Sequence, residues 1–488
     1  MSVADTDEGQ IRVIAAPATP DDYDTRVFDS PILPADPEAL TALADAVRGA
    51  DLAAPPVVLP DFHHERHMEA PCSIAVATRN TIRPTVNNAS VNCGMALIAL
   101  DVERPRTGAI ADFYERLRTR YPYPPTMRRD LTSREVLRCA AEGSTFATER
   151  FDVDPGELDR VEERGRIDLE SFGGPGRVRR ELPRLIVQLS RTRFGTIGPS
   201  NHFVELQEVE EILDPMAADL LGVSAGQVTL QYHAGGGVLT GLVGRLYGRR
   251  TDFPRRHRAI MAVQKPLLHL ATARSLSELR LRKFLYFSGE CPPIPRDSRE
   301  GARLMLANAA AMNYGFAFRL AIYQALRSMA LETLGVRSSK LIVDSPHDTM
   351  YEEDLDGQKV LLHRYKSCRA YPPSRMAGHP VFGRVGQPVL VPGLHSTSSY
   401  LCVADEGASE SLYSACHGTG SVISDFARRG LSGPDPRGRS TLRFRYSDAA
   451  PVEVPHLDDH GIDEAVGVLV RHRIVRPVAR LRPFAVLT

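Results

Sequence analysis

The chain has 488 residues, of which 43% are hydrophobic and 25% are charged, as is usual for a globular protein with one large core or two to three smaller ones. Its formal net charge is zero, which excludes a global field that would attract nucleic acid, so any such site must be a local basic patch. Seven scattered cysteines without CxxC spacing argue against a disulfide framework and for a reducing compartment.

The N-terminal residues are acidic and do not resemble a signal peptide, and no apolar run reaches membrane length. We therefore expect a cytoplasmic protein without a membrane partner. Residues 1–30 are polar and acidic, which predicts a loosely ordered tail. The first predicted helix covers Pro37–Arg48, with Asp36 as its N-cap and Gly49 just beyond its end.

The stretch Pro56–Val102 carries the first metal-competent side chains. The apolar run 56–60 ends in a group of titratable residues, which are Asp61, His63, His64, Glu65 and His67. An apolar segment follows over Ser73–Thr78, and the stretch closes on Cys93-Gly94 before the strand-like Met95–Val102. Such residues at strand ends favour a metal site on a rigid scaffold. A solvated histidine loop and a small core cysteine form the alternative interpretation.

Further elements follow in the middle of the chain. Helices are predicted over 107–120, 133–142 and 215–221, with a partly irregular segment over 152–180. His202–Val209 alternates as a strand does, which places Asn201, Phe203 and Glu205 on one face. A second strand, 227–232, ends in a glycine-rich turn from His233 to Gly237, whose backbone N–H groups could approach a phosphate.

The last third begins with the longest helical pattern, Gly301–Gly335. Short strands are predicted over 341–343, 389–391, 399–403, 465–469 and 482–487, and a basic stretch covers Val360–Tyr371. Five histidines, at positions 63, 202, 233, 347 and 417, end a strand or open a turn. Imidazoles with a thiolate suit Mn, Zn or Fe, and glycine-rich turns suit a phosphate. From its residues alone, the chain is predicted to be a metal-dependent enzyme acting on a phosphorylated substrate.

Several ordered segments resemble those of one known family. They are Pro60-Asp61-Phe62-His63, Asn92-Cys93-Gly94-Met95, Gly195–Gly198 with Asn201–Glu205, His233-Ala234-Gly235, Asn313, Asp344 with His347, His363-Arg364, Arg369-Ala370, Gly386–Val389 with Pro392-Gly393, and Cys416–Gly420. On these segments the chain is identified as a member of the RtcB family, GTP-dependent ligases that join 2′,3′-cyclic-phosphate or 3′-phosphate RNA ends to 5′-hydroxyl ends. The resemblance runs from about residue 59 to 488.

The resemblance implies a single α+β catalytic domain over residues 31–488, with mixed sheets around a central metal site. It implies Cys93, His202, His233 and His347 as ligands of one or two Mn²⁺ ions, and His417 as the nucleophile that takes GMP from GTP. The implied nucleotide contacts are Asn201, Glu205, His417, Gly418 and Gly420. Weaker candidates for RNA or phosphate contacts are Asp61, His63, Arg364 and Arg369, with Arg428 and Arg429 as further surface arginines. Implied partners are RNA, such as tRNA halves or broken RNA, GTP and an archease-like activator.

The chain also departs from the family pattern. Ser90 stands where the family has a ligating Asp, and the segment from His64 to His67 is a candidate substitute ligand. Four further departures fall on the nucleotide pocket and are Tyr365, Leu394, Ser421 and Thr488. They favour the alternative of a divergent relative with an altered metal and nucleotide pocket that performs another phosphoryl or nucleotidyl transfer, or phosphoester hydrolysis. A non-catalytic RNA-binding scaffold is a third hypothesis, which the retained His417 disfavours.

Overall fold

The computed structural model describes residues 11–14, 23–64, 68–86, 90–123, 126–198, 201–247, 255–288, 291–448 and 450–488. The helices are α1 (Pro37–Val47), α2 (Thr107–Arg120), α3 (Ser133–Glu142), α4 (Ser144–Phe151), α5 (Val178–Glu181), α6 (Arg184–Leu189), α7 (Pro215–Leu221), α8 (Gly237–Leu246), α9 (Arg255–Ala271), α10 (Leu276–Phe287), α11 (Arg299–Thr333), α12 (Gly420–Arg428) and α13 (His460–Arg471). The strands are β1 (Arg12–Ile14), β2 (Thr25–Val27), β3 (Val57–Val58), β4 (Ile74–Thr78), β5 (Thr81–Ile82), β6 (Gly94–Leu100), β7 (Phe203–Ile212), β8 (Val228–Ala234), β9 (Ile294–Pro295), β10 (Ser339–Pro346), β11 (Asp348–Leu355), β12 (Gln358–Tyr365), β13 (Ser367–Arg369), β14 (Pro388–Val391), β15 (Ser399–Ala404), β16 (Ser414–Cys416), β17 (Ser440–Phe444), β18 (Val452–Pro455) and β19 (Val475–Leu487).

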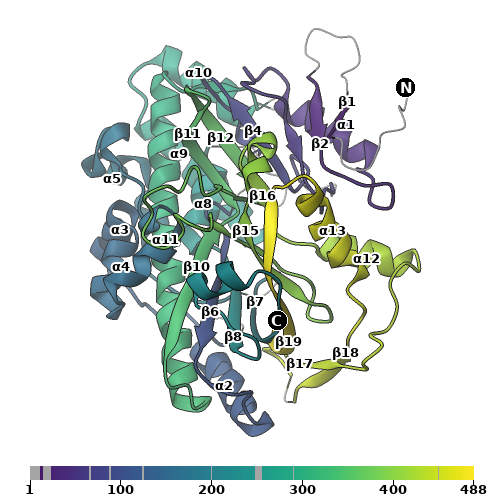
Figure 1. The fold of residues 1–488 in the computed structure, drawn as a ribbon. Helices are drawn as coiled ribbons and strands as arrows, with labels where there is room; N and C mark the ends of the chain where they lie inside the picture. Colours follow the sequence, from purple (N-terminus) through teal and green to yellow (C-terminus); the bar gives the residue numbers. More distant parts are fainter. Residues whose placement is uncertain are drawn as a thin grey trace.

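Two mixed sheets dominate the described part of the chain and confirm the predicted α+β class (Figure 1). A nine-stranded sheet runs in the order β10-β6-β8-β7-β19-β15-β14, with β17 and β18 attached to β19. A six-stranded sheet runs in the order β1-β2-β3-β4-β12-β11. Strand β10 of the larger sheet is followed almost at once by β11 of the smaller one, so the chain crosses between the sheets at His347. This crossing point matters for the site described below.

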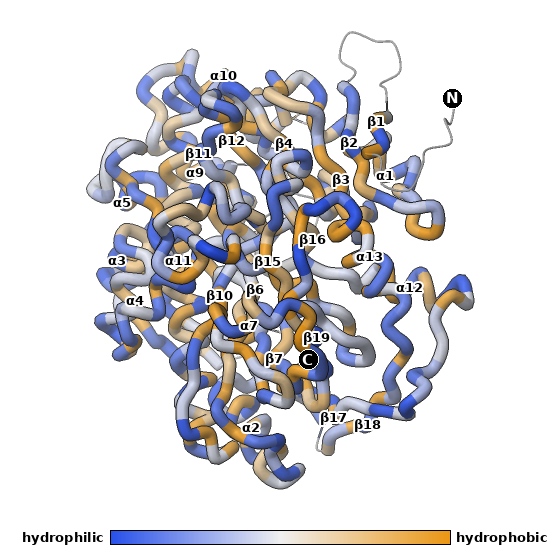
Figure 2. Tube along the Cα trace, viewed as in Figure 1, coloured by the Kyte–Doolittle hydropathy of each residue, from blue (hydrophilic) through white to orange (hydrophobic). Residues whose placement is uncertain are grey.

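The 35-residue helix α11 is the central helix on one side of the molecule. Figure 1 shows it running beside α3, α4 and α8, and most of its residues are buried. A helix that is apolar nearly all round belongs in the interior, because each side must face other protein rather than water. The hydrophobic segments follow the central strands, while polar segments dominate the outer helices and loops (Figure 2). No helix in the described ranges is both long enough and apolar enough to cross a bilayer.

The local signals for helices were reliable. The predicted helices over 107–120, 133–142 and 215–221 are confirmed as α2, α3 and α7, and the predicted helix from Pro37 ends one residue earlier than expected. Asp36 caps α1 by accepting a 2.9 Å hydrogen bond from the backbone N–H of Glu38. The capping box of Thr132 and Glu135 likewise fixes the start of α3.

Three expectations differ from the structure. The predicted strand over 465–469 is wrong, because these residues belong to helix α13, where Ile462, Ala465, Val466 and Leu469 are buried at helical spacing. His233 and Ala234 do not open a turn but complete β8, so the glycine turn shrinks to two residues before α8. Within the segment predicted to be a loosely ordered tail, β1 pairs with β2, β2 pairs with β3, and Phe28 is buried in the same apolar cluster as Val57, so residues 25–28 are held against the six-stranded sheet.

Candidate functional site

Strand pairing brings three predicted ligands to one end of the large sheet. Strand β6 is antiparallel to β8 with Met95 opposite His233, and β7 is antiparallel to β8 with Phe203 opposite His233. Cys93 and His202 directly precede β6 and β7, so both lie beside the end of β8. The Sγ atom of Cys93 is 3.2 Å from Nε2 of His233 and 3.7 Å from Nε2 of His202.

The crossing between the two sheets adds a second group of donors. The backbone N–H of His347 donates a 2.8 Å hydrogen bond to the carbonyl of Cys93, and Nε2 of His347 is 3.2 Å from Nε2 of His233. Asp348, the next residue, is buried and opens β11. Two groups of donor atoms, each within 4.8 Å of one another, therefore share Cys93, and they are Cys93-His202-His233 and Cys93-His347-Asp348.

Hydrogen bonds fix which ring nitrogen of two histidines is free. Nδ1 of His233 is 2.9 Å from the carbonyl of Asn201, and Nδ1 of His417 is 3.0 Å from the carbonyl of Lys366. Since a carbonyl only accepts, Nδ1 carries the proton in both rings and Nε2 keeps its lone pair. The ring of His417 lies 4.0 Å, centroid to centroid, from that of His347 and 6.2 Å from that of His233. His417 is thus part of the same cluster.

Burial keeps these imidazoles neutral. It lowers the pKa of His202 to about 4 and that of His417 to about 3, with nearby Lys366 adding to the effect on His417. The pKa values of His233 and His347 are also well below the usual range, first through burial and then through neighbouring histidines. Burial raises the pKa of the Cys93 thiol to about 12. Neutral imidazoles are the form that binds a metal, whereas the thiol must lose its proton to do so.

The donor set fits a divalent transition-metal ion. It combines imidazole nitrogen, sulfur and carboxylate oxygen in a buried cluster, and the buried Nδ1 atoms of His202 and His347 have no hydrogen-bond partner among the described residues. Asp348 was not predicted as a site residue. The signal for it was its position, since it is a carboxylate directly after a predicted ligand at the start of a strand.

A fully buried ion pair holds the Cys93 loop against α11. Arg319 donates to the carboxylate of Asp344 at 2.6–3.1 Å and also to the backbone carbonyl and side chain of Asn92. Asn92 has a positive φ of 61° and its amide donates to the carbonyl of Met312. The residue before Cys93 is therefore anchored at two points of one helix. A Cβ atom on Gly94 would lie 2.8 Å from the carbonyl of Ser345, so the loop has no room for a larger residue there.

The predicted nucleotide contacts lie around this cluster. Glu205 is buried on β7 and accepts a 2.7 Å hydrogen bond from the side chain of Gln207, and burial raises its pKa to about 8. Asn201 supplies its carbonyl to His233, while its side chain is exposed. Gly418 follows His417, and Gly420 is the first residue of α12.

The predicted RNA or phosphate contacts separate into two groups. Arg364 and Arg369 were expected at the surface, and this prediction is wrong, because they are only 1% and 6% exposed. Arg364 pairs with Glu353 at 2.5 Å and Arg369 pairs with Glu163, because two arginines in the interior require carboxylate partners. The other group lines a cleft of about 610 Å³ between the N-terminal segment and α12, and its members are Asp61, His63, Arg428 and Arg429. His64 lines the same cleft.

Two of the residues that depart from the family pattern, Ser421 and His64, lie at this cleft. Ser421 donates to Asp61 through its backbone N–H at 2.9 Å and through its hydroxyl, so it belongs to the wall of that cleft. Nε2 of His64 lies 3.0 Å from the carbonyl of Met68, away from the donor groups named above. Glu65, Arg66 and His67, the rest of the candidate substitute segment, lie outside the described residues.

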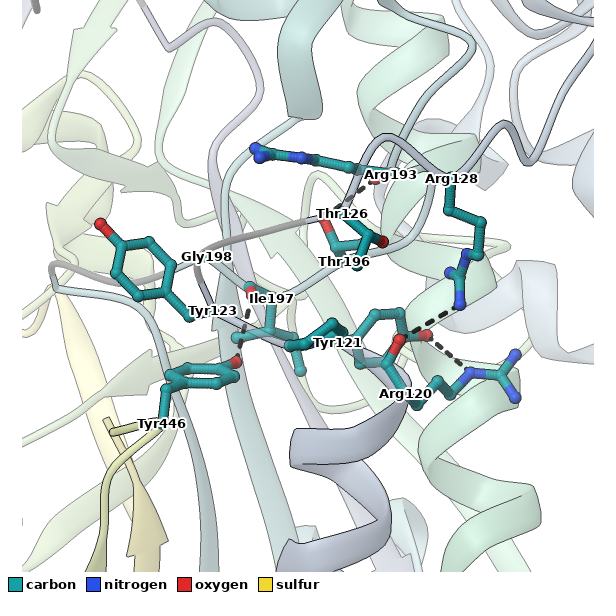
Figure 3. Close-up of a pocket in the computed structure, with 11 residues that line it drawn as sticks. Arg120, Tyr121, Tyr123, Thr126, Arg128, Arg193, Thr196, Ile197, Gly198 and Tyr446 are labelled. Atoms are coloured by element: carbon teal, nitrogen blue, oxygen red, sulfur yellow. Dashed lines mark hydrogen bonds between the residues drawn. The ribbon is translucent and has the colours of Figure 1, made fainter. Parts of the chain in front are cut away.

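A second pocket lies beside the loop that leads to His202. Its lining includes Arg120, Tyr123, Arg193, Gly198 and Tyr446 (Figure 3). The hydroxyl of Tyr446 donates a 3.1 Å hydrogen bond to the carbonyl of Ile197. A Cβ atom on Gly198 would lie 3.2 Å from Nδ1 of His202, so this lining residue of the pocket lies next to one ring of the histidine cluster.

Comparison with known proteins gives a consistent result. A family model described as tRNA-splicing ligase RtcB matches residues 50–488. The tRNA-splicing ligase RtcB of Pyrococcus horikoshii is 31% identical over 338 residues, which cover 65% of this chain and 36% of that protein. The protein of the same name from Thermococcus kodakarensis is 26% identical over 454 residues, covering 88% of this chain and 86% of the relative. The RNA-splicing ligase RtcB of Mycobacterium tuberculosis is 28% identical over 416 residues, covering 80% and 87%. The chain spans only about a third of the length of the Pyrococcus relatives.

Proposed function

Because the chain belongs to the RtcB family, we propose that it is an RNA ligase that joins 3′-phosphate or 2′,3′-cyclic-phosphate ends to 5′-hydroxyl ends, using GTP and Mn²⁺. The observation that carries the proposal is the position of His417. Its Nδ1 proton is held by the carbonyl of Lys366, and its ring lies against His347 in the Cys93 cluster. A neutral imidazole with a free Nε2 lone pair is a nucleophile at neutral pH.

The proposed first step forms a phosphoramidate. Nε2 of His417 attacks the α-phosphorus of GTP, a nitrogen–phosphorus bond forms, and the bond to the bridging oxygen breaks with pyrophosphate as the leaving group. The Nδ1–H bond to Lys366 then stabilises the positive charge that develops on the ring. Asn201, Glu205, Gly418 and Gly420 are the proposed nucleotide contacts.

Two further substitutions complete the proposed reaction. An oxygen of the RNA 3′-phosphate attacks the histidine-bound phosphorus, which releases His417 and leaves GMP linked to the RNA end. The 5′-hydroxyl of the second RNA then attacks the 3′-phosphorus, loses its proton, and displaces GMP. A 2′,3′-cyclic phosphate must first be opened by water to the 3′-phosphate. Splitting the joining of two ends into such steps lowers each barrier.

The metal would be held by the two donor groups that share Cys93. When bound, it supplies positive charge that neutralises the reacting phosphates and lowers the pKa of a bound hydroxyl. Cys93, His202 and His233 form one position and Cys93, His347 and Asp348 the other. We propose that Asp348 provides the carboxylate that Ser90 cannot.

The test is labelling with GTP carrying a radioactive α-phosphate in the presence of Mn²⁺. The wild type should form a covalent, acid-labile GMP adduct, and His417→Ala should form none. His460→Ala is the matched control, since His460 is an exposed histidine on α13 and should leave labelling unchanged. A wild type that binds Mn²⁺ but forms no adduct with any nucleotide would refute the ligase proposal. An archease-like activator and a cytoplasmic location belong to the same proposal, and adding such an activator to the ligation assay tests the first.

One observation favours the second candidate, a divergent phosphoryl transferase or phosphoesterase. Ser421 stands where the family has an arginine, so the positive charge of that arginine is missing here. The backbone N–H and the hydroxyl of Ser421 donate to Asp61 instead. Loss of a charge-assisted hydrogen bond typically costs about 1.5–3 kcal/mol, so GTP affinity depends on compensation elsewhere. An adduct with another nucleotide, but not with GTP, would favour this candidate.

A further inference from the structure

Helices α9 and α10 form a hairpin with an apolar outer face. They are joined by residues 272–275, and the ring of His269 on α9 stacks on that of Tyr286 on α10 at 4.2 Å (Figure 1). Among the described residues, 18 large hydrophobic side chains are exposed, and seven of them form this outer face, namely Val263, Leu267, Leu270, Leu276, Leu281, Phe284 and Phe287. Leu276, where α10 begins at the tip of the hairpin, is 75% exposed. Exposed apolar side chains gathered in this way mark a surface that contacts another molecule.

Charged and polar groups hold the inner side of the hairpin in place. Arg282 is 1% exposed and donates to the carboxylate of Glu300 on α11 at 2.9 Å and to the backbone carbonyl of His269 at 2.5 Å. The hydroxyl of Tyr286 donates to the other oxygen of Glu300 at 2.8 Å. A surface helix normally turns its charged side chains outward and its apolar side inward. On α10 an arginine is buried while phenylalanines are exposed, so the apolar outer face belongs to a hairpin with a fixed position.

The hairpin also carries an excess of positive charge. Four of its cations are exposed and have no carboxylate within ion-pair distance in the described part of the chain, and they are Arg258, Arg274, Arg280 and Lys283. Glu278 is the only acidic residue between positions 258 and 288, and it already pairs with Arg282 at 2.7 Å and with Arg299. A molecule that covers the outer face must therefore offer negative charge as well as an apolar interior.

The cations lie among the apolar side chains and not only at their border. At about 100° per residue, Arg280 and Lys283 fall within the same arc of about 60° around α10 as Leu276 and Phe287. A second copy of the chain that docked through the same face would bring these like charges together. An RNA strand would pair with the cations but would leave the leucines in water. A protein helix packed on the leucines would bury the cations beneath it.

A bilayer with anionic head groups satisfies both kinds of side chain at once. Leucine and phenylalanine enter between the head groups, while the long side chains of arginine and lysine reach the lipid phosphates from the same helix face. We propose that the outer face of the α9–α10 hairpin binds the surface of an anionic lipid bilayer, with Leu276 and Phe284 among the head groups and Arg280 and Lys283 on lipid phosphates. From the sequence we expected no membrane partner, and the proposal departs from that expectation. It does not rest on the ligase reaction.

The experiment is co-sedimentation of the full chain with vesicles of phosphatidylcholine alone and of phosphatidylcholine mixed with phosphatidylglycerol. The wild type should bind the mixed vesicles, should be released from them by salt, and should bind phosphatidylcholine alone about tenfold more weakly or less. Arg280→Gln and Lys283→Gln should each lower the partition coefficient on mixed vesicles by about fivefold. Leu276→Ser and Phe284→Ser should each lower it by about tenfold. All four positions are exposed, and unchanged thermal melting by circular dichroism shows that the variants are folded.

Matched controls come from exposed residues on other elements. Met216→Ser removes an apolar side chain that is 57% exposed on α7, and Arg106→Gln removes one exposed arginine before α2. Both should partition like the wild type. A wild type that does not bind the mixed vesicles would overturn the proposal. So would a Leu276→Ser protein that binds them as well as the wild type, because the attraction would then come from charge alone.

Two further measurements test the other occupants. In sedimentation velocity, a wild-type dimer that Leu276→Ser converts to a monomer would overturn the proposal in favour of a second copy of the chain. Binding of single-stranded RNA that Lys283→Gln weakens and Leu276→Ser does not, in a protein that ignores vesicles, would overturn it in favour of RNA. GMP labelling of His417 is measured without vesicles and should be unchanged in Leu276→Ser, so failure of the ligase proposal and failure of this one are read separately.

Discussion

The carboxylate of Asp61 accepts hydrogen bonds from both the backbone N–H and the hydroxyl of Ser421, and so ties the 61–64 loop to the first turn of α12. The N–H of Val422 adds a longer bond of 3.4 Å to the same oxygen. Asp61 therefore satisfies backbone donors that the first turn of a helix leaves open. Because α12 starts at Gly420, three residues after His417, this contact also restrains the segment that carries the candidate nucleophile.

The first prediction concerns this cap. Ser421→Ala removes the hydroxyl bond but keeps the backbone bond, and Asp61→Ala removes both, so we expect losses of about 0.5 and about 1–2 kcal/mol in the free energy of unfolding. Urea denaturation measures both. Ser424→Ala, on the same helix, is the control, since its hydroxyl bonds only to the carbonyl of Gly420 and should change stability little. Equal losses for the two serines would contradict the capping role.

The second prediction concerns metal content. Asp348→Asn should remove one of two Mn²⁺ ions per chain, because a neutral amide replaces the only carboxylate in the described donor groups. The double variant Ser90→Asp with Asp348→Asn should restore the second ion, since the backbone of Ser90 contacts that of Cys93. Elemental analysis after dialysis gives the count.

The control for metal content is Asp354→Asn, on the exposed face of the same strand β11. It should retain the wild-type number of ions. An Asp348→Asn protein that keeps both ions would rule out Asp348 as a ligand.

The third prediction concerns pH. Burial raises the pKa of Glu205 to about 8 from the ordinary glutamate value of 4.5. Between these two pH values the folded chain keeps a proton on this carboxyl that the unfolded chain has lost. The contribution of Glu205 to the free energy of unfolding is fully present below about pH 4.5 and is lost as the pH rises to about 8. The loss is about 4–5 kcal/mol, at about 1.36 kcal/mol per pKa unit.

Glu205→Gln should remove that fall and leave the protein more stable than the wild type at pH 8. Urea midpoints between pH 5 and pH 8.5 measure the effect. Glu211→Gln, an exposed position on the same strand, should keep the wild-type pH profile. A wild-type profile in Glu205→Gln would contradict the assignment.

The fourth prediction concerns the buried ion pair of Arg319 and Asp344. Replacing one partner leaves an uncompensated buried charge, so Asp344→Asn and Arg319→Met should each cost about 3–5 kcal/mol. Replacing both partners by apolar residues should cost less than the sum of the single changes. Arg337→Met, from the exposed pair with Asp101, should destabilise the protein far less than either of these single changes, because solvent screens an exposed pair. Additive losses in the double variant would show that the pair is not coupled.

The sequence predicted well what neighbouring residues determine. The helix over 133–142 carries its own capping box, the helix over 107–120 has buried apolar residues at helical spacing, and both have the predicted bounds. The strand predicted over 465–469 is wrong because a short run of apolar residues fits a buried strand and a helix equally well. Packing of α13 against α12 decides between them.

The site was predicted by residue type more than by geometry. Sheet register brings Cys93, His202 and His233 side by side, and the crossing from β10 to β11 adds His347. The strand pattern alone specifies neither. The sequence does not predict Asp348 as a site residue, because its position beside Cys93 depends on the crossing between two sheets. Arg364 and Arg369 were misplaced because their burial depends on Glu353 and Glu163, which lie elsewhere in the chain.

Helix α11 also sets a fixed spacing between two parts of the molecule. Asn313 bonds to the carbonyls of Ala140 and Ile167 on the outer helical layer, and Arg319 bonds to Asp344 and Asn92 beside Cys93. Six residues of helix place these two side chains about 9 Å apart along the axis and about 240° apart around it. Deleting any one residue between them would rotate one set of bonds by about 100° relative to the other, so both could not form at once. The length of this short segment is therefore as constrained as the identity of its residues.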